Sequence, residues 1–157
     1  MPADTEESHP VPGTEDDAIS TYGRLVEVVR RLDRAFAATV TGEFGLPMGQ
    51  FEVLLRLGRT PGDELTMSDL ARQLGVTSGG ATRLVDRLLD ADLVARRACT
   101  RDRRVQHVRL TPAGRIQLER MLVAHRADLA RELTGRLDAE QRATLDRLLD
   151  LLRGDGA

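Results

Sequence analysis

The chain has 157 residues, of which 41% are hydrophobic and 3% aromatic, and its formal net charge is -2. A chain of this length supplies one compact unit, with one core or two small cores that share helices. Its apolar runs are too short to span a bilayer and its amino terminus does not resemble a signal peptide, so we expect a soluble cytoplasmic protein. The single cysteine, Cys99, excludes an internal disulfide and a zinc site built from several cysteines.

Charge is distributed unevenly along the chain. Residues 1–17 contain six acidic residues, three prolines and no arginine, which predicts a disordered acidic tail. Residues 67–111, in contrast, contain nine arginines and five aspartates, a local net charge of +4. The chain contains no lysine, so its cationic side chains are planar guanidinium groups that can donate two hydrogen bonds at once. The small net charge of the whole chain therefore conceals a basic segment.

Two helices are predicted in the first third of the chain. Apolar residues recur at spacings of three and four over about residues 17–41, a stripe too long for one small core. Gly42 and Gly45 are expected to end this first helix. A second helix is expected to begin at Pro47 and to close at Gly58, before a polar turn.

Two shorter helices follow, joined at a glycine. Thr66 and Asp69 form a capping pair that opens a helix ending at Gly75. Thr77 or Ser78 caps the next helix, which runs to about residue 91. Because glycine accepts the left-handed conformation that a tight interhelical turn requires, this pattern predicts a helix-turn-helix.

Extended segments at residues 94–98 and 105–110 are separated by a polar turn and predict a two-stranded hairpin. A hairpin directly after a helix-turn-helix forms a wing. Thr111 and Pro112 start another long helix, and a last helix is expected to end at Gly154 after a cap at Asp138. The predicted fold class is mainly α, a winged helix-turn-helix with a two-stranded β wing.

The order of these elements, with their residues, resembles the MarR family of winged helix-turn-helix transcriptional regulators. The resemblance covers about residues 22–153. Its most specific parts are SDLA at 68–71, TRLVDRL at 82–88, DLVAR at 92–96, and DRR at 102–104 followed by LTPAG at 110–114. It implies a homodimer that represses transcription from a pseudo-palindromic operator and responds to a small aromatic or phenolic effector, whose site the sequence does not assign.

The resemblance also divides the chain. Residues 1–17 are the tail, 18–45 an N-terminal dimerisation helix, 46–111 the DNA-binding domain and 112–154 the C-terminal dimerisation helices. Two positions depart from the family pattern, because Pro47 replaces the usual Thr or Ser and Asp92 replaces the usual Gly. Both departures affect element boundaries and leave the residues expected to contact DNA unchanged.

The DNA-contacting residues are expected at the start and outer face of the second short helix and at the wing. Small residues at the start of the helix allow its amides and dipole to approach phosphate, and an arginine one turn further can donate to guanine. An arginine at the wing tip, Arg103 or Arg101, suits the narrow minor groove, and Asp102 is expected to orient Arg104. The full set of predicted DNA-binding residues is Ser78, Gly79, Gly80, Thr82, Arg83, Arg87, Arg101, Asp102, Arg103 and Arg104.

Other interpretations stay open. Arg83 and Arg87 could instead pair with Asp86 and Asp90 on a solvated surface, and the wing could be a plain solvated turn. An oxidant sensor would use Cys99, whose thiol pKa neighbouring arginines could lower. A winged helix can also serve as a protein-interaction module.

The remaining polar residues point to no further chemistry. His107 and His125 are expected to be a wing-strand residue and a core or dimer-interface residue, because neither has a metal ligand at suitable spacing. No catalytic motif is evident, so we predict no enzymatic activity, no cofactor and no metal site.

Overall fold

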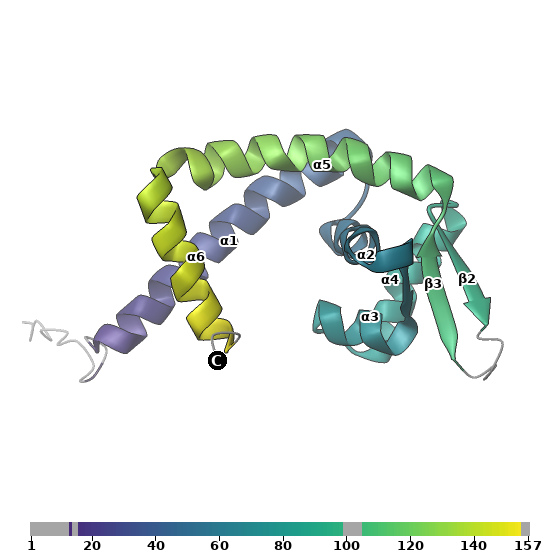
Figure 1. Cartoon of the computed structure of the whole chain (residues 1–157), viewed down its shortest axis with the longest axis horizontal. Helices are drawn as coiled ribbons and strands as arrows, with labels where there is room; N and C mark the ends of the chain where they lie inside the picture. Colours follow the sequence, from purple (N-terminus) through teal and green to yellow (C-terminus); the bar gives the residue numbers. More distant parts are fainter. Residues whose placement is uncertain (1–12, 14–15, 99–104, 155–157) are drawn as a thin grey trace, which may run out of the picture. The chain divides into compact units, whose positions relative to one another are not determined.

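The structure of the protein is a computed structural model, and it describes residues 13, 16–98 and 105–154 (Figure 1). The chain divides into two compact units, one ending at Arg34 and the other beginning at Ala35. Helix α1 runs through both units. None of the described helices combines the length and hydropathy that a membrane span requires. The helices and strands are α1 (Asp17–Phe44), α2 (Met48–Arg59), η1 (Pro61–Asp63), β1 (Glu64–Thr66), α3 (Met67–Leu74), α4 (Ser78–Asp90), β2 (Val94–Ala98), β3 (Gln106–Leu110), α5 (Pro112–Glu132), η2 (Thr134–Arg136) and α6 (Ala139–Arg153).

Helix α2 is the centre of the core in the second unit. It contacts α3, α4, α5 and the sheet, because its sequence is apolar on several sides. Phe51, Leu54 and Leu57 on this helix are fully buried, and each contributes about 1.5–3 kcal/mol through the apolar surface that it removes from water. Leu70 of α3, Leu88 of α4 and Met121 of α5 are also fully buried. The core therefore fixes α3 and α4 against α2.

The helix-turn-helix forms as predicted. The Oγ1 atom of Thr66 accepts a hydrogen bond from the Asp69 amide at 3.1 Å and caps α3. Gly75 ends α3 with a φ of 66°, in the left-handed region, and its turn leads directly into α4. The Oγ1 atom of Thr77 caps α4 by accepting from the Gly80 amide at 3.1 Å.

The two strands of the predicted wing hairpin form as β2 and β3, and the sheet contains one further strand that was not predicted. A third strand, β1, pairs with β3, and the strand order is β1-β3-β2 with both pairs antiparallel. The third strand escaped prediction for a physical reason: β1 has only three residues, of which Leu65 alone is buried, and so short a segment does not stand out as an alternating pattern. The strands β2 and β3 occupy the segments expected for the wing.

The two faces of the sheet have different compositions. Leu65, Val108, Leu110 and Val94 are buried on the face that meets the core. Because residues alternate between faces along a strand, the register places a second set on the opposite face. That set contains Glu64, Arg97, His107 and Arg109.

The boundaries of α1 and α2 also differ from expectation. Gly42 lies inside α1, which continues to Phe44 and is followed by Gly45 with a φ of 66°. Gly58 lies inside α2 instead of closing it. A Cβ atom at Gly58 would lie 2.4 Å from Cδ2 of Leu118, so the glycine permits close packing of α2 and α5. Neither glycine has to end a helix, because glycine can adopt helical backbone angles at a modest energetic cost.

The start of α5 is joined to the start of β2. Thr111 caps α5 by accepting from the Gly114 amide at 2.9 Å, and its hydroxyl donates to the carbonyl of Asp92 at 2.7 Å. Asp92 has a φ of 55°, in the left-handed region that glycine adopts most easily. This backbone geometry explains in physical terms why glycine would be favoured at this position.

Candidate nucleic-acid interface

The start of α4 presents a surface of small polar residues. Ser78 and Gly79 are exposed, and a Cβ atom at Gly79 would meet nothing within 4 Å. The first amides of a helix have no intrahelical acceptor, and Thr77 satisfies only that of Gly80 by its side chain. The helix dipole adds positive potential at the same end. This end of α4 can therefore accept an anionic group at close range.

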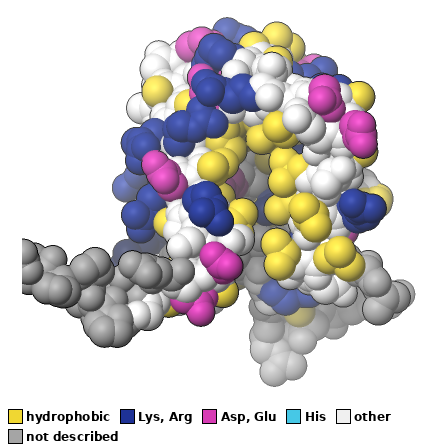
Figure 2. Space-filling view, turned by 90° about the vertical axis from the view of Figure 1, so that its left-hand side faces the viewer, with side chains coloured by type: hydrophobic (Ala, Val, Ile, Leu, Met, Phe, Trp, Pro, Cys, Tyr) yellow, Lys and Arg dark blue, Asp and Glu magenta, His cyan; other side chains and the backbone are white. Residues whose placement is uncertain are grey.

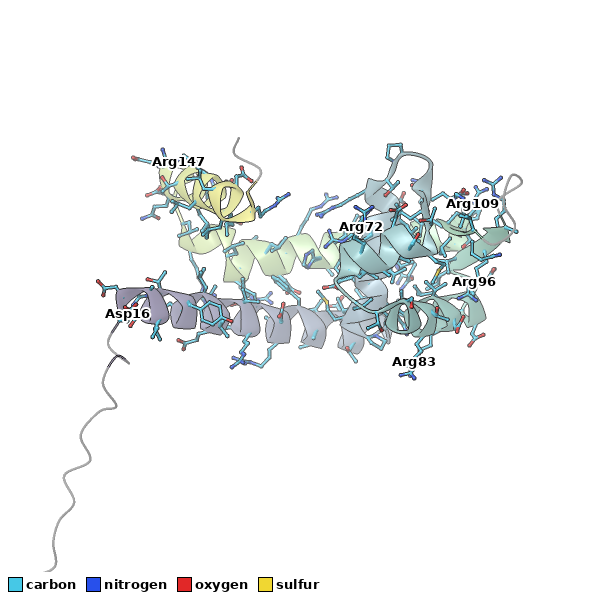
Figure 3. The ribbon with its side chains drawn as sticks, turned by 90° about the horizontal axis from the view of Figure 1, so that it is seen from below. Asp16, Arg72, Arg83, Arg96, Arg109 and Arg147 are labelled. Carbon is cyan, nitrogen blue, oxygen red and sulfur yellow. The ribbon has the colours of Figure 1, made fainter. Side chains whose placement is uncertain are left out.

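The outer face of α4 carries exposed arginines. Arg83 and Arg87 are exposed, and Figure 3 shows Arg83 pointing away from the helix. Neither guanidinium has an ion-pair partner within residues 16–98 and 105–154, so the alternative pairing with Asp86 and Asp90 is not observed there. Both cations are available to an external acceptor.

Asp86 instead joins α4 to the wing. Its Oδ1 atom lies 2.8 Å from Nη2 of Arg96 on β2, and the two side chains are 50% and 33% exposed. Thr82 lies on the same helix and donates from its hydroxyl to the carbonyl of Ser78 at 2.9 Å. Its oxygen can still accept a hydrogen bond.

A concave surface lies between the helix-turn-helix and the wing. It is formed by the starts of α3 and α4 together with the facing ends of β2 and β3. The lining combines hydroxyl groups, one guanidinium and one amide with two apolar side chains, and most of its surface is apolar. The residues that line it are Thr66, Met67, Ser68, Ser78, Thr82, Arg96, Val105 and Gln106.

Sequence reasoning missed several of these residues. Ser68 was part of the SDLA segment, yet its place beside α4 depends on the turn at Gly75. Arg96 lies in β2 two residues after the buried Val94 and opposite the buried Val108, so its position in the strand alone would suggest the core face. A basic residue at a core-facing position of a predicted strand is the signal that could have found it.

On the face of the sheet opposite the core, one carboxylate contacts two strands. The Oε1 atom of Glu64 accepts from Nη2 of Arg97 at 2.9 Å and lies 2.9 Å from Nδ1 of His107. The hydrogen bond from Arg97 is the main cause that lowers the pKa of Glu64 below its usual value; desolvation opposes it, and the charges of Arg97, His107 and Arg109 add smaller lowering contributions. Glu64 is therefore ionised at neutral pH.

Five of the predicted residues lie outside the described part of the chain. They are Cys99, Arg101, Asp102, Arg103 and Arg104. The predictions made for them, minor-groove insertion, orientation of Arg104 by Asp102 and oxidant sensing, stay predictions.

The two histidines occupy the places expected for them. His107 lies in β3, and the ring of His125 in α5 packs edge-on against Phe36 and Phe51, with ring centroids 4.7 and 5.1 Å apart. Burial lowers the pKa of His125, and this effect outweighs the opposing influence of Asp128. Among the described residues, no group of three or more His, Cys, Asp or Glu side chains could hold a metal ion.

A helix-turn-helix whose second helix exposes its start and its arginines, followed by a hairpin, defines a winged helix-turn-helix protein. The model of the MarR family matches residues 44–105. Three known proteins are similar over most of their length, and the chain belongs to the MarR family.

The similar proteins are regulators. The transcriptional repressor YetL of Bacillus subtilis is 25% identical over 147 residues, which cover 94% of this chain and 87% of YetL. The MarR family transcriptional regulator AbsC of Streptomyces coelicolor has a TM-score of 0.80 and 28% identity, with 89% of this chain and 95% of AbsC covered. A mutant MarR of E. coli, solved in complex with operator DNA, has a TM-score of 0.74 and 32% identity, covering 86% of this chain and 95% of that protein.

Proposed function

We propose that this protein is a sequence-specific DNA-binding transcriptional regulator that acts as a repressor. The observation that carries the proposal is the outer surface of α4, where Arg83 and Arg87 are exposed and without an ion-pair partner in the described structure. A similar protein of 32% identity was solved with operator DNA, which supports the same role for this chain.

In the proposed complex α4 enters the major groove. The amides and dipole at its start approach phosphate across Ser78 and Gly79, where small side chains leave room. Arg83 lies one turn further and can donate two hydrogen bonds to O6 and N7 of a guanine. Thr82 offers a hydroxyl beside it, and Arg87 contacts the sugar-phosphate backbone.

The wing, which joins β2 to β3, is proposed to enter the adjacent minor groove. Arg101 or Arg103 enters the groove in this proposal, and Asp102 orients Arg104. The support is the position of the two strands beside the concave surface that α3 and α4 line.

The regulator is proposed to be a homodimer, with residues 46–111 binding DNA and the flanking helices forming the dimer. In the first unit, Tyr22 of α1 is 69% exposed, and in the second unit Leu152 of α6 is 73% exposed. Figure 2 shows hydrophobic side chains at the surface of the protein. Apolar helix faces of this kind are expected to be covered by a partner. Exposed large hydrophobic residues on α1, α5 and α6 are Ile19, Tyr22, Leu25, Val28, Val29, Ile116, Val123, Leu148, Leu149, Leu151 and Leu152.

A small aromatic or phenolic anion is the proposed effector. A groove between the end of α1 and α5 contains Phe44, Arg120 and Arg131, an aromatic ring and two cations that suit such an anion. The same groove contains the carboxylates of Glu43 and Asp128, the second of which pairs with Arg131. Aromatic carboxylates that lower the affinity for DNA at saturating concentration would support this part of the proposal.

The side chains exposed on α4 disfavour the protein-interaction alternative. A helix that recognises a protein would expose apolar residues, whereas the exposed side chains of α4 include Thr82, Arg83, Arg87 and Asp90. The oxidant-sensing alternative depends on Cys99 and fails if a Cys99→Ser variant responds to peroxide as the wild type does.

Selection from a library of random duplexes tests the proposed function. The purified protein should enrich a site with two half-sites related by inverted symmetry and about one helical turn apart. Affinity should fall steeply as salt rises, because arginines displace counterions from phosphate. The proposal would be contradicted if the protein enriched no sequence, or if it bound the enriched duplex and a scrambled duplex with equal affinity.

A further inference from the structure

Glu64 occupies a position that links all three strands of the sheet. Backbone hydrogen bonds join β1 to β3 and β3 to β2, whereas β1 and β2 are not neighbours. The Oε1 atom of Glu64 on β1 accepts from Nη2 of Arg97 on β2 at 2.9 Å, across 33 positions of sequence. The same oxygen lies 2.9 Å from Nδ1 of His107 on β3.

Strand β1 is continuous with the helix-turn-helix. Its last residue, Thr66, is also the cap of α3, and α3 packs on α4. The other two strands form the hairpin that leads to the wing. The contacts of Glu64 therefore fix the direction of that hairpin relative to α3 and α4.

The charge of Glu64 makes its position unexpected in a protein that binds DNA. It lies on the sheet face that carries Arg97, His107 and Arg109, and its side chain is 20% exposed. An acid in this basic region repels phosphate, so its removal would strengthen DNA binding if charge alone mattered. If Glu64 only neutralised its basic neighbours, its removal would likewise strengthen DNA binding.

We propose that Glu64 is a positioning residue for DNA binding, which holds the β2–β3 hairpin at the angle that brings the wing to the minor groove. The proposal rests on the proposed function of the protein. Its central consequence is that removal of this acid weakens binding, the opposite of the effect of charge alone.

The test uses the full chain and the duplex enriched in the selection. A Glu64→Ala variant should bind this duplex about fivefold more weakly, the effect of losing one exposed, charge-assisted contact. Glu119→Ala is the matched control, because Glu119 is an exposed acid of α5 with no ion-pair partner among the described residues. The control should bind as the wild type does.

Chemical footprinting separates positioning from a general loss of structure. In the Glu64→Ala complex, hydroxyl-radical protection of the flanking minor grooves should weaken, while protection of guanine N7 in the major groove under α4 is retained. A Glu64→Gln variant keeps an acceptor for Arg97 and should recover part of the flanking protection. It also serves as the test variant if Glu64→Ala does not fold.

Equal or tighter binding by both Glu64 variants, with unchanged flanking protection, would overturn the proposal and leave the proposed function intact. A wild-type protein that prefers no duplex would instead contradict the proposed function, and this proposal with it. Uniform loss of protection over the whole site would also overturn it, because that result indicates a general structural defect.

Discussion

A Gly114→Ala substitution should destabilise the protein at the junction of β2 and α5. A Cβ atom at this position would lie 1.8 Å from the carbonyl oxygen of Leu93, and real Cβ atoms essentially never approach closer than 3.0 Å. The colliding atoms belong to the backbone, so no side-chain rotation relieves the contact. The start of α5 must move away from Leu93 by more than an ångström.

The magnitude follows from the hydrogen bonds at this junction. The Thr111 amide donates to Leu93 at 3.2 Å, the Thr111 hydroxyl donates to the carbonyl of Asp92 at 2.7 Å, and the Gly114 amide donates to Thr111 at 2.9 Å. At about 1 kcal/mol for each, their loss lowers the free energy of unfolding by about 3 kcal/mol. The melting temperature should then fall by about 6–12 °C.

Urea denaturation followed by circular dichroism measures this change, at one protein concentration because dimerisation would stabilise the fold. Gly79→Ala is the matched control, since a Cβ atom there meets nothing within 4 Å. Its free energy of unfolding should stay equal or rise by up to about 1 kcal/mol, because alanine favours the helix. A Gly114→Ala variant as stable as this control would refute the geometric argument.

Two further predictions concern DNA binding and pH. The Gly79→Ala variant should bind the selected duplex about tenfold more weakly, because its methyl group keeps the start of α4 from the DNA. Fluorescence anisotropy measures this affinity. An affinity equal to that of the wild type would exclude the close approach of α4 to the DNA. Burial lowers the pKa of His125 below 6.5, so the unfolded chain binds the proton first and stability falls as pH decreases below 6.5. In a His125→Phe variant, the free energy of unfolding should fall less between pH 7.5 and 5.5 than it does in the wild type. An identical dependence on pH in the two proteins would show that His125 does not cause the loss of stability.

Local patterns were sufficient to predict the helix caps. Thr66, Thr111 and Asp138 each cap the helix that the sequence assigned to them, and Thr77, one of the two residues expected there, caps α4. A cap depends on residues two or three positions away, so its information lies within one short segment. The left-handed glycine at residue 75 was predictable for the same reason.

Contacts between distant segments were not predictable from one sequence. Strand β1 exists because it pairs with β3, whose partner residues lie more than 40 positions away. The ion pair of Asp86 with Arg96 and the contacts of Glu64 likewise depend on how the strands meet the helices. For the candidate site, the sequence thus identified the exposed residues of α4 but not the residues that connect α4 and β1 to the wing.

The affinity of an Arg83→Ala variant for the selected duplex tests most directly whether α4 recognises the DNA sequence. Arg147→Ala is the control, because Arg147 is an exposed arginine of α6 without an ion-pair partner in the described structure and its loss changes the net charge equally. If α4 recognises the DNA sequence, Arg83→Ala loses about 1–3 kcal/mol of binding free energy and tolerates substitution of one guanine, while the control keeps both affinity and preference. Equal affinity and unchanged base preference in the two variants would contradict the claim that α4 recognises the DNA sequence.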